Sequence, residues 1–261
     1  MDLRLLGMTG IEVSPLGLGS VKFGRNEQVK YPAGFEIPDD AAVSRLLSMA
    51  RDLGINLIDT APAYGTSEER LGQLLPGNRQ DWVIVTKVGE IFEQGQSRFD
   101  FSDQHTRLSV ENSLRRLQTD YLDVVLIHSH GDDMQILEHE PVLETLRDLQ
   151  RKGLVRAIGM SSKTVEGGLR VVETCDLVMA TCNLDYNDEL PVLQAAEREG
   201  KGVLVKKGLM SGHVQGEEGV RRSMEFIFSQ PGVSSMIVGT INPDHLASNV
   251  RLMDTVLNRS G

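Results

Sequence analysis

The sequence predicts an α/β fold, a (β/α)8 TIM barrel preceded by a short N-terminal β-hairpin, from its length, its apolar runs and their spacing. The chain has 261 residues, and a barrel of this kind needs roughly 250. Short apolar runs alternate with stretches of helical periodicity, most of them at about the 30-residue spacing of a strand–helix–strand unit. Because there are eight such alternations, a closed barrel is favoured over an open sheet.

The predicted barrel strands are the apolar runs themselves. Several runs are unbroken rather than alternating, which is typical of parallel strands that are buried on both faces. The runs span residues 16–19, 56–59, 83–87, 124–128, 155–159, 178–181, 203–206 and 236–239.

Helix signals lie between the runs, where apolar residues recur three and four positions apart. Asn242 followed by Pro243 predicts an N-cap and the first position of the last helix. Thr66 with Glu69 predicts a capping box at the start of a helix over residues 68–75.

The chain is expected to form one domain over residues 1–261, because no linker or low-complexity block divides it. At its start, residues 3–6 and 11–13 lie on either side of a glycine-bounded turn, which predicts a small β-hairpin.

The composition narrows the function classes. The net charge of −10 argues against nucleic-acid binding and against an anionic membrane surface, since both require basic groups. No apolar run reaches the roughly 18 residues that span a bilayer, and the N-terminus lacks a signal-peptide pattern, so a cytoplasmic location is expected. Cys175 and Cys182 fit neither a disulfide framework nor a CxxC motif.

Polar residues end the apolar runs, at the positions where TIM barrels carry their chemistry. Asp59 and Lys87 end adjacent predicted strands, so opposite charges are expected to face each other at the barrel mouth. Tyr64 follows Asp59 by five residues, in a loop that can fold back over the same mouth, and His128 ends the next strand.

Each of these residues taken alone has an ordinary structural interpretation. A strand-end Asp or Lys is commonly solvated or part of a structural ion pair, a loop tyrosine commonly packs, and a strand-end histidine is commonly a hydrogen-bonded structural group. Four complementary groups at one mouth predict instead a catalytic set formed by Asp59, Tyr64, Lys87 and His128.

The same segments resemble the aldo-keto reductase superfamily, in its short bacterial type. Residues 56–65 resemble the family segment that carries the catalytic aspartate and tyrosine, and the resemblance extends from the hairpin to Asn249. Residues 86–87 resemble the family's lysine motif, and residues 126–128 resemble its histidine motif. The helix-to-strand segment before that histidine is similar at 113–123, and the fifth-strand motif is similar at 158–161. All of these motifs stand in the family order.

The resemblance implies an oxidoreductase acting on CH–OH and C=O groups, which reversibly reduces aldehydes or ketones with NAD(P)H. Tyr64 would be the proton donor, and Lys87 would lower its pKa. Asp59 would orient the lysine, and His128 would hydrogen-bond the carbonyl oxygen. The partner is thus a small carbonyl or alcohol, on a monomer or weak homo-oligomer, while the physiological substrate and the favoured direction stay open.

The implied cofactor is NADP(H), with NAD(H) as the alternative, although no complete G-x-G-x-x-G fingerprint is present. The family binds the nucleotide extended across the barrel mouth. The residues that would contact it are Gly19, Ser20, Ser161, Ser162, Asn183, Lys206, Lys207, Gly208, Leu209, Ser211, Gly239, Thr240, His245 and Asn249.

Several of these positions depart from the family pattern. Ser162 replaces the usual asparagine, and Asn183 replaces the usual glutamine. Lys206 replaces a tyrosine that stacks on the nicotinamide ring, so it is expected either to be solvated or to contact a cofactor phosphate. His245 stands where an arginine often holds the 2′-phosphate, which weakens the expected preference for NADP(H).

The connection over residues 90–103 is predicted to be the longest strand-to-helix loop and to wall the substrate pocket. Its aromatics Phe92, Phe99 and Phe101 are equally compatible with packing of the loop onto the barrel.

Two other functions remain open. His128 and His130 form a His-x-His pattern that suits a metal-dependent hydrolase. A non-catalytic subunit that senses the nicotinamide nucleotide is the second alternative, and binding without turnover would identify it.

Overall fold

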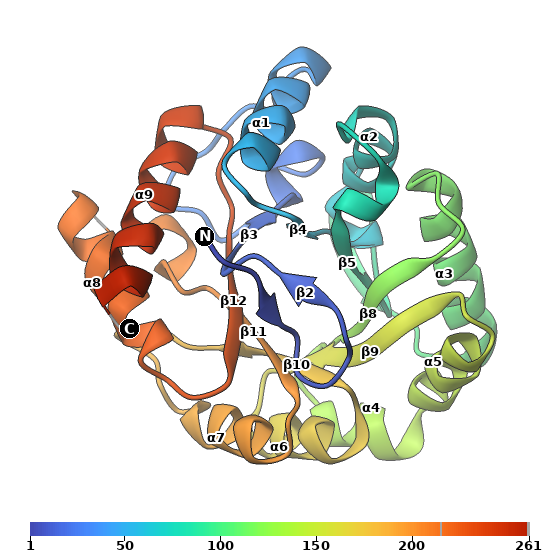
Figure 1. The fold of residues 1–261 in the computed structure, drawn as a ribbon. Helices are drawn as coiled ribbons and strands as arrows, with labels where there is room; N and C mark the ends of the chain where they lie inside the picture. The colour runs from blue at the N-terminus through green and yellow to red at the C-terminus, as the bar shows by residue number, and fades with distance from the viewer. Residues whose placement is uncertain (215, 260–261) are drawn as a thin grey trace.

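The computed structural model describes residues 1–214 and 216–259. Eight parallel strands form a closed barrel in the order β10-β11-β12-β3-β4-β5-β8-β9 (Figure 1). These strands are β3 (Leu16–Gly19), β4 (Leu57–Asp59), β5 (Val83–Val88), β8 (Leu122–His128), β9 (Val155–Ser161), β10 (Leu177–Thr181), β11 (Gly202–Lys206) and β12 (Val233–Val238). Each contains or overlaps one predicted apolar run, so the predicted TIM barrel is confirmed.

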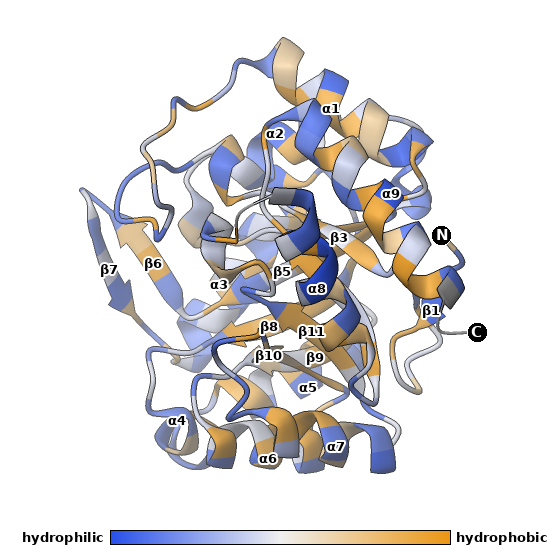
Figure 2. Ribbon diagram, turned by 90° about the vertical axis from the view of Figure 1, so that its left-hand side faces the viewer, coloured by the Kyte–Doolittle hydropathy of each residue, from blue (hydrophilic) through white to orange (hydrophobic). Residues whose placement is uncertain are grey.

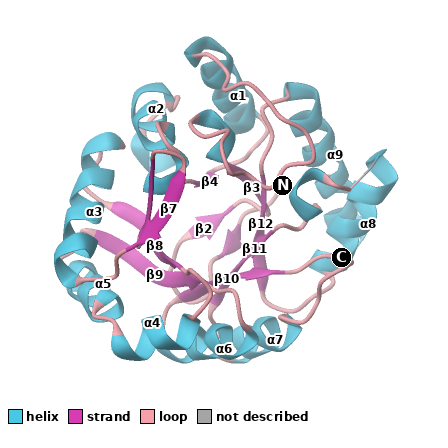
Figure 3. Ribbon diagram, turned by 180° about the vertical axis from the view of Figure 1, so that it is seen from behind, coloured by secondary structure: helices cyan, strands magenta, loops and turns pink. Residues whose placement is uncertain are grey.

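The helices form an outer ring around the strands (Figure 3). They are α1 (Asp40–Asp52), α2 (Ser67–Leu74), α3 (Asp103–Arg116), α4 (Asp133–His139), α5 (Val142–Arg151), α6 (Val165–Thr174), α7 (Leu190–Arg198), α8 (Gly216–Phe228) and α9 (Pro243–Arg259). Among the described residues, no helix is both long and apolar enough to cross a membrane. The predicted single domain extends to residue 261, and positions 215, 260 and 261 lie outside the described residues.

Each barrel strand contributes to two apolar layers, which explains the unbroken apolar runs. In β5, Val83 and Val85 belong to a cluster inside the barrel, whereas Ile84 belongs to the layer between barrel and helices. Figure 2 shows the resulting concentration of apolar residues on the strands, with polar residues largely on the helices. Because side chains alternate along a strand, every second residue points into the barrel.

The N-terminal hairpin closes one end of the barrel. Strands β1 (Arg4–Leu5) and β2 (Glu12–Val13) pair antiparallel, as predicted. Leu6 and Ile11 are buried in the inner cluster, and the Leu6 side chain lies against Gly202, the first residue of β11. The hairpin therefore covers the amino ends of the strands, and the carboxyl ends form the other mouth.

The helix-start predictions had different outcomes. Asn242 caps α9 as predicted, because its Oδ1 accepts a hydrogen bond of 2.8 Å from the backbone N–H of Asp244. The prediction of a capping box at Thr66 is wrong. Thr66 has φ −83° and ψ 8°, outside the extended conformation of an N-cap, and in the described chain its side chain makes no cap hydrogen bond.

The two longest connections lie at the carboxyl end of the barrel. Residues 90–99 form an antiparallel hairpin of β6 (Glu90–Glu93) and β7 (Gln96–Phe99) that stands at the side of the molecule (Figure 2). The connection from Gly19 to Asp40, which contains the short helix η1 (Val21–Phe23), is longer. The prediction that 90–103 is the longest strand-to-helix loop is therefore wrong. Residues 20–39 form a longer one, because the short η1 is the only regular element that the structure describes between β3 and α1.

Candidate active site

Three adjacent strands end in the predicted catalytic residues. Strand β4 pairs with β5, and β5 pairs with β8, so Asp59, Lys87 and His128 lie on neighbouring strands. Lys87 continues the inward-facing series of Val83 and Val85 by the two-residue alternation of a strand. The apolar alternation of the sequence thus also directs these polar side chains into the barrel mouth.

Lys87 and Asp59 form a buried ion pair. The Lys87 Nζ lies 2.5 Å from Asp59 Oδ1 and donates a second hydrogen bond of 2.8 Å to the Thr60 carbonyl. The lysine side chain is 2% exposed. A charge this deeply buried persists only when it is paired and hydrogen-bonded, so the pair is fixed in place within the mouth.

Tyr64 reaches this pair from the short helix η2 (Pro62–Tyr64), which follows β4 directly. The Lys87 Nζ lies 4.9 Å from the centroid of the Tyr64 ring. The next residue, Gly65, has φ +62°, and a Cβ there would lie 2.1 Å from the Gly24 carbonyl oxygen. Only glycine allows the chain to turn this tightly and hold the tyrosine over the mouth.

The pKa of Tyr64 is raised well above its ordinary value. Burial is the largest cause, and the Asp59 and Glu90 carboxylates act in the same direction. The expectation that Lys87 leaves this pKa below its ordinary value is wrong, because burial and the two carboxylates disfavour a tyrosinate more strongly than the nearby cations favour it. Tyr64 is accordingly a firmly protonated phenol.

His128 faces a carboxylate that the sequence did not single out. Its Nδ1 lies 2.8 Å from Glu90 Oε2, and both side chains are largely buried. Burial lowers the pKa of His128, whereas Glu90 opposes that shift. Glu90 follows the Lys87 strand directly, but nothing in the sequence distinguished it from Glu93 on the same hairpin.

Arg25 holds Glu90 from the opposite side. Its Nη1 lies 3.5 Å from Glu90 Oε1 and donates a hydrogen bond of 3.1 Å to the Ala63 carbonyl. The guanidinium carbon lies 3.4 Å from the centroid of the Phe92 ring. Arg25 thereby links the hairpin, the Tyr64 turn and the connection after β3.

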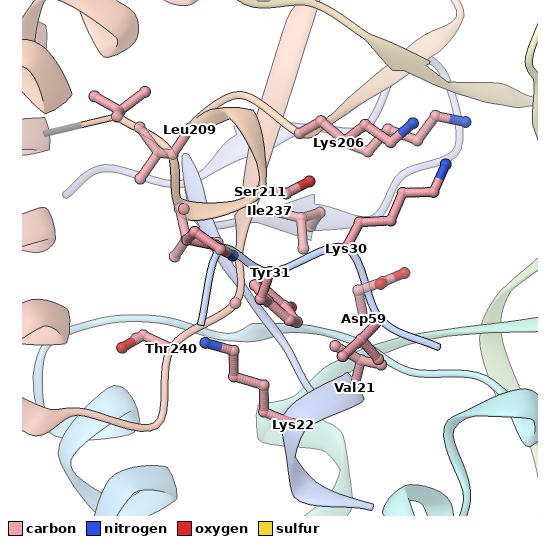
Figure 4. Close-up of a pocket in the computed structure, with 18 of the residues that line it drawn as sticks. Val21, Lys22, Lys30, Tyr31, Asp59, Lys206, Leu209, Ser211, Ile237 and Thr240 are labelled. Carbon is pink, nitrogen blue, oxygen red and sulfur yellow. The ribbon is translucent and has the colours of Figure 1, made fainter. Parts of the chain in front are cut away.

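The four predicted catalytic residues line one cavity of about 980 Å³ at the barrel mouth. In the view of Figure 4, Tyr31 lies at the centre of the labelled residues, with Asp59 to its right, Lys206 and Ser211 above it, and Thr240 below it to the left. Ten predicted cofactor residues also line it: Gly19, Ser161, Lys206, Lys207, Leu209, Ser211, Gly239, Thr240, His245 and Asn249.

The other four are not among the described residues that line the cavity. Ser20 donates to the Asp59 carbonyl and receives a hydrogen bond from Ser67. Asn183 donates to the Lys207 carbonyl, Gly208 packs against Met236, and Ser162 is fully buried. These residues shape the wall of the cavity behind its surface.

Lys206 is not a solvated lysine. Its Nζ donates a hydrogen bond of 2.8 Å to Ser161 Oγ and another to the Ser162 carbonyl. Burial lowers its pKa to about 7, although Glu189 acts in the opposite direction. An amine of this kind changes charge near neutral pH, at the wall of the cavity.

The turn after Lys206 is strained. Lys207, Met210 and Ser211 have φ of 57°, 51° and 56°, respectively. Non-glycine residues rarely adopt positive φ, and such residues cluster at ligand sites and switch regions. This turn forms part of the cavity wall.

The connection after β3 supplies residues that the sequence did not indicate. Lys22 places its Nζ 3.9 Å from the centroid of the Tyr31 ring, and both residues line the cavity (Figure 4). Tyr31 approaches Gly239 so closely that a Cβ there would lie 2.7 Å from the tyrosine hydroxyl. This contact arises from the tertiary fold, because the two residues are more than 200 positions apart.

The aromatics of the 90–103 connection pack the loop rather than form the cavity surface. Phe99 and Phe101 stack with centroids 6.1 Å apart, and both contact the ring of His130. Among the described residues that line the cavity, neither phenylalanine nor His130 is found. The His128 and His130 side chains therefore lie in different surroundings, and the described residues contain no group of three or more metal-ligating side chains.

The Aldo/keto reductase family model matches residues 15–225, which include all four predicted catalytic residues. The chain belongs to the aldo/keto reductase family. It is 32% identical to L-galactose dehydrogenase from Arabidopsis thaliana, over 81% of this chain and 66% of that protein. It is 26% identical to the uncharacterized oxidoreductase YqkF from Bacillus subtilis, over 96% of this chain and 90% of that protein.

Solved structures of aldo/keto reductases have the same fold. The Pseudomonas aeruginosa protein PA4992 superposes with a TM-score of 0.90 and 56% identity, covering 98% of this chain and 96% of that chain. AKR11C1 from Bacillus halodurans has a TM-score of 0.78 at 24% identity, which supports the fold alone. This aldo/keto reductase spans just under two thirds of L-galactose dehydrogenase and 54% of yeast D-arabinose 1-dehydrogenase.

Proposed function

We propose that this chain is a single-domain, nicotinamide-nucleotide-dependent oxidoreductase that reversibly reduces aldehydes or ketones to alcohols. The observation that carries the proposal is the convergence of Tyr64, the Lys87–Asp59 pair and His128 on one cavity. A carbonyl that accepts hydride develops negative charge on oxygen, and it requires a proton donor and hydrogen bonds at that atom. Tyr64 and His128 supply these two functions.

The cavity fits an extended nicotinamide dinucleotide. Gly19 and Gly239 line the cavity without side chains of their own, and the Tyr31 hydroxyl lies against Gly239. The 17-residue helix α9 begins at Pro243 near the cavity, and a helix N-terminus favours phosphate. Hydroxyl donors at Ser161, Ser211 and Thr240 complete a set suited to a polar, anionic ligand.

The reduced nicotinamide, when bound, supplies the hydride. Tyr64 then gives its phenolic proton to the carbonyl oxygen, which becomes strongly basic as the negative charge develops. A raised tyrosine pKa keeps this donor protonated before reaction. The neighbouring Lys87 ammonium stabilises the phenolate that remains, and Asp59 holds the lysine in position.

We propose NADP(H) as the cofactor and treat NAD(H) as the alternative to be compared. The cavity carries Lys22, Lys30, Lys206 and Lys207 in a chain of net charge −10. Local cations of this kind favour an anionic nucleotide against the overall field of the protein.

The test combines binding with turnover. The wild-type protein is titrated with NADPH and NADH by fluorescence and then assayed with a panel of aldehydes, ketones and sugars. The proposal expects saturable binding of at least one nucleotide and consumption of that nucleotide with a carbonyl. Binding without turnover on the whole panel would contradict it and would favour a nucleotide-sensing subunit.

A further inference from the structure

The proton transfer proposed above makes no use of Glu90, although this carboxylate lies inside the catalytic group. Glu90 is the first residue of β6, and its side chain is 11% exposed. Its Oε2 lies 2.8 Å from Nδ1 of His128, and its Oε1 accepts a hydrogen bond of 2.6 Å from the Ser97 hydroxyl. Arg25 lies 3.5 Å from Oε1. Three groups from different parts of the chain therefore fix the orientation of this carboxylate.

Glu90 is ionised at neutral pH. Burial alone would raise its pKa, but the contacts with His128, Ser97 and Arg25 lower it to about 2. An ionised carboxylate can only accept hydrogen bonds. A proton on the His128 nitrogen that faces it makes this contact attractive, as an ion-pair contact in which the N–H is not aligned for a hydrogen bond.

We propose that Glu90 is a positioning residue for the oxidoreductase reaction proposed above: it holds a proton on Nδ1 of His128 and leaves Nε2 to face the reacting oxygen. The inference rests on that proposed function. The proposal adds different roles for the two ring nitrogens of His128: Nδ1 contacts the protein, and Nε2 is available to the substrate.

The protonation state of His128 then decides whether Nε2 can donate a hydrogen bond. The doubly protonated ring donates its Nε2–H to the reacting oxygen in both directions, while Tyr64 gives the proton in reduction and, as the phenolate, takes it back in oxidation. The neutral ring, with its proton held on Nδ1, has only a lone pair on Nε2 and donates no hydrogen bond there. Without Glu90 the neutral ring is free to carry its proton on Nε2.

The charges around His128 come from several elements. Lys87 on β5 and Lys206 on β11 oppose its protonation, as burial does, and Glu90 on β6 favours it. The Tyr64 ring lies edge-on with its centroid 6.3 Å from that of His128. Glu90 thus offsets the two lysines and the cost of burial in part, and the pKa of His128 stays below its ordinary value.

The direct test is the tautomer of His128, measured by ¹⁵N NMR on histidine-labelled protein. A His128→Gln variant identifies the signal among the six histidines. We expect the Nδ1–H form for the neutral ring of the wild type, and a shift toward Nε2–H in Glu90→Gln. A wild-type ring in the Nε2–H form, or an unchanged tautomer in Glu90→Gln, would overturn the proposal.

The kinetic test compares the pH profiles of carbonyl reduction. We expect wild-type reduction to fall as pH rises through the pKa of His128, because Nε2–H is lost. Glu90→Gln weakens this dependence, because its neutral ring can keep the proton on Nε2. NADPH affinity, measured by fluorescence, stays unchanged.

Glu93→Gln is the matched control, since Glu93 lies on the same strand with its side chain 67% exposed. It is expected to leave tautomer and profiles unchanged. Identical profiles for wild type and Glu90→Gln would overturn the proposed role. An inactive wild-type protein would contradict the proposed function instead, while the NMR result would still decide whether Glu90 sets the tautomer.

Discussion

Lys87 Nζ and Asp59 Oδ1 lie 2.5 Å apart across two neighbouring strands, at a depth where the lysine side chain is 2% exposed. The pair stands at the end of an inward-facing apolar series, so it is surrounded by a barrel that cannot solvate a single charge. Both the stability of this part of the barrel and the charge environment of Tyr64 therefore depend on the ion pair between Lys87 and Asp59.

Asp59→Asn is expected to destabilise the protein by about 3–5 kcal/mol, because it leaves the Lys87 charge buried without its partner. Adding Lys87→Met should recover a large part of this loss, and urea unfolding of both singles and the double variant measures the coupling. Asp52→Asn breaks an exposed pair with Arg51 and should cost less than about 1 kcal/mol. Equal losses in Asp59→Asn and Asp52→Asn would contradict this account.

Gly65→Ala is expected to displace Tyr64 and to lower stability. Gly65 has φ +62° and no room for a Cβ beside the Gly24 carbonyl. Gly10 has a similar φ of +71° with nothing within 4 Å of its Cβ position, so Gly10→Ala isolates the backbone strain. Gly65→Ala should lose at least about 2 kcal/mol more than Gly10→Ala in chemical unfolding. A matching loss would show that the close approach does not constrain the turn.

Lys206 is expected to make nucleotide binding depend on pH. Its pKa is lowered to about 7, so it loses its positive charge as pH rises through neutrality. NADPH affinity should therefore fall between about pH 6 and pH 8 in the wild type, with a smaller change in Lys206→Met. Lys201, which donates to the Cys175 carbonyl behind the barrel, provides the control Lys201→Met. The same pH dependence in Lys206→Met and wild type would contradict a role for this lysine.

The sequence predicted the barrel well because its strands are buried on both faces. Unbroken apolar runs such as 124–127, repeated at this spacing, are typical of parallel strands between two apolar layers. The same regularity predicted that Asp59, Lys87 and His128 would meet, since the carboxyl ends of parallel strands share one mouth.

Features set by backbone angles or tertiary contacts could not be predicted in this way. Thr66 had the residue type of an N-cap but not the extended backbone. Glu90 acquired its role only when the β6–β7 hairpin placed it against His128. Tyr31 reaches Gly239 from the far end of the sequence, and no local pattern encodes that approach.

The pKa of Tyr64 shows a further limit. The direction of its net shift depends on how burial, Asp59 and Glu90 weigh against the nearby cations, and that balance requires coordinates. The sequence predicted the correct neighbours and the wrong direction of the pKa shift.

The central claim is that Tyr64 donates the proton, and Tyr64→Phe tests it most directly. The measurement is the rate of NADPH consumption with an active carbonyl, together with the NADPH dissociation constant. Tyr121→Phe serves as the control, because Tyr121 precedes β8 at the opposite end of the barrel and packs against Arg79. The account predicts unchanged binding in both variants and a loss of turnover of about 100-fold or more in Tyr64→Phe alone. Turnover in Tyr64→Phe equal to that of the wild type would contradict it.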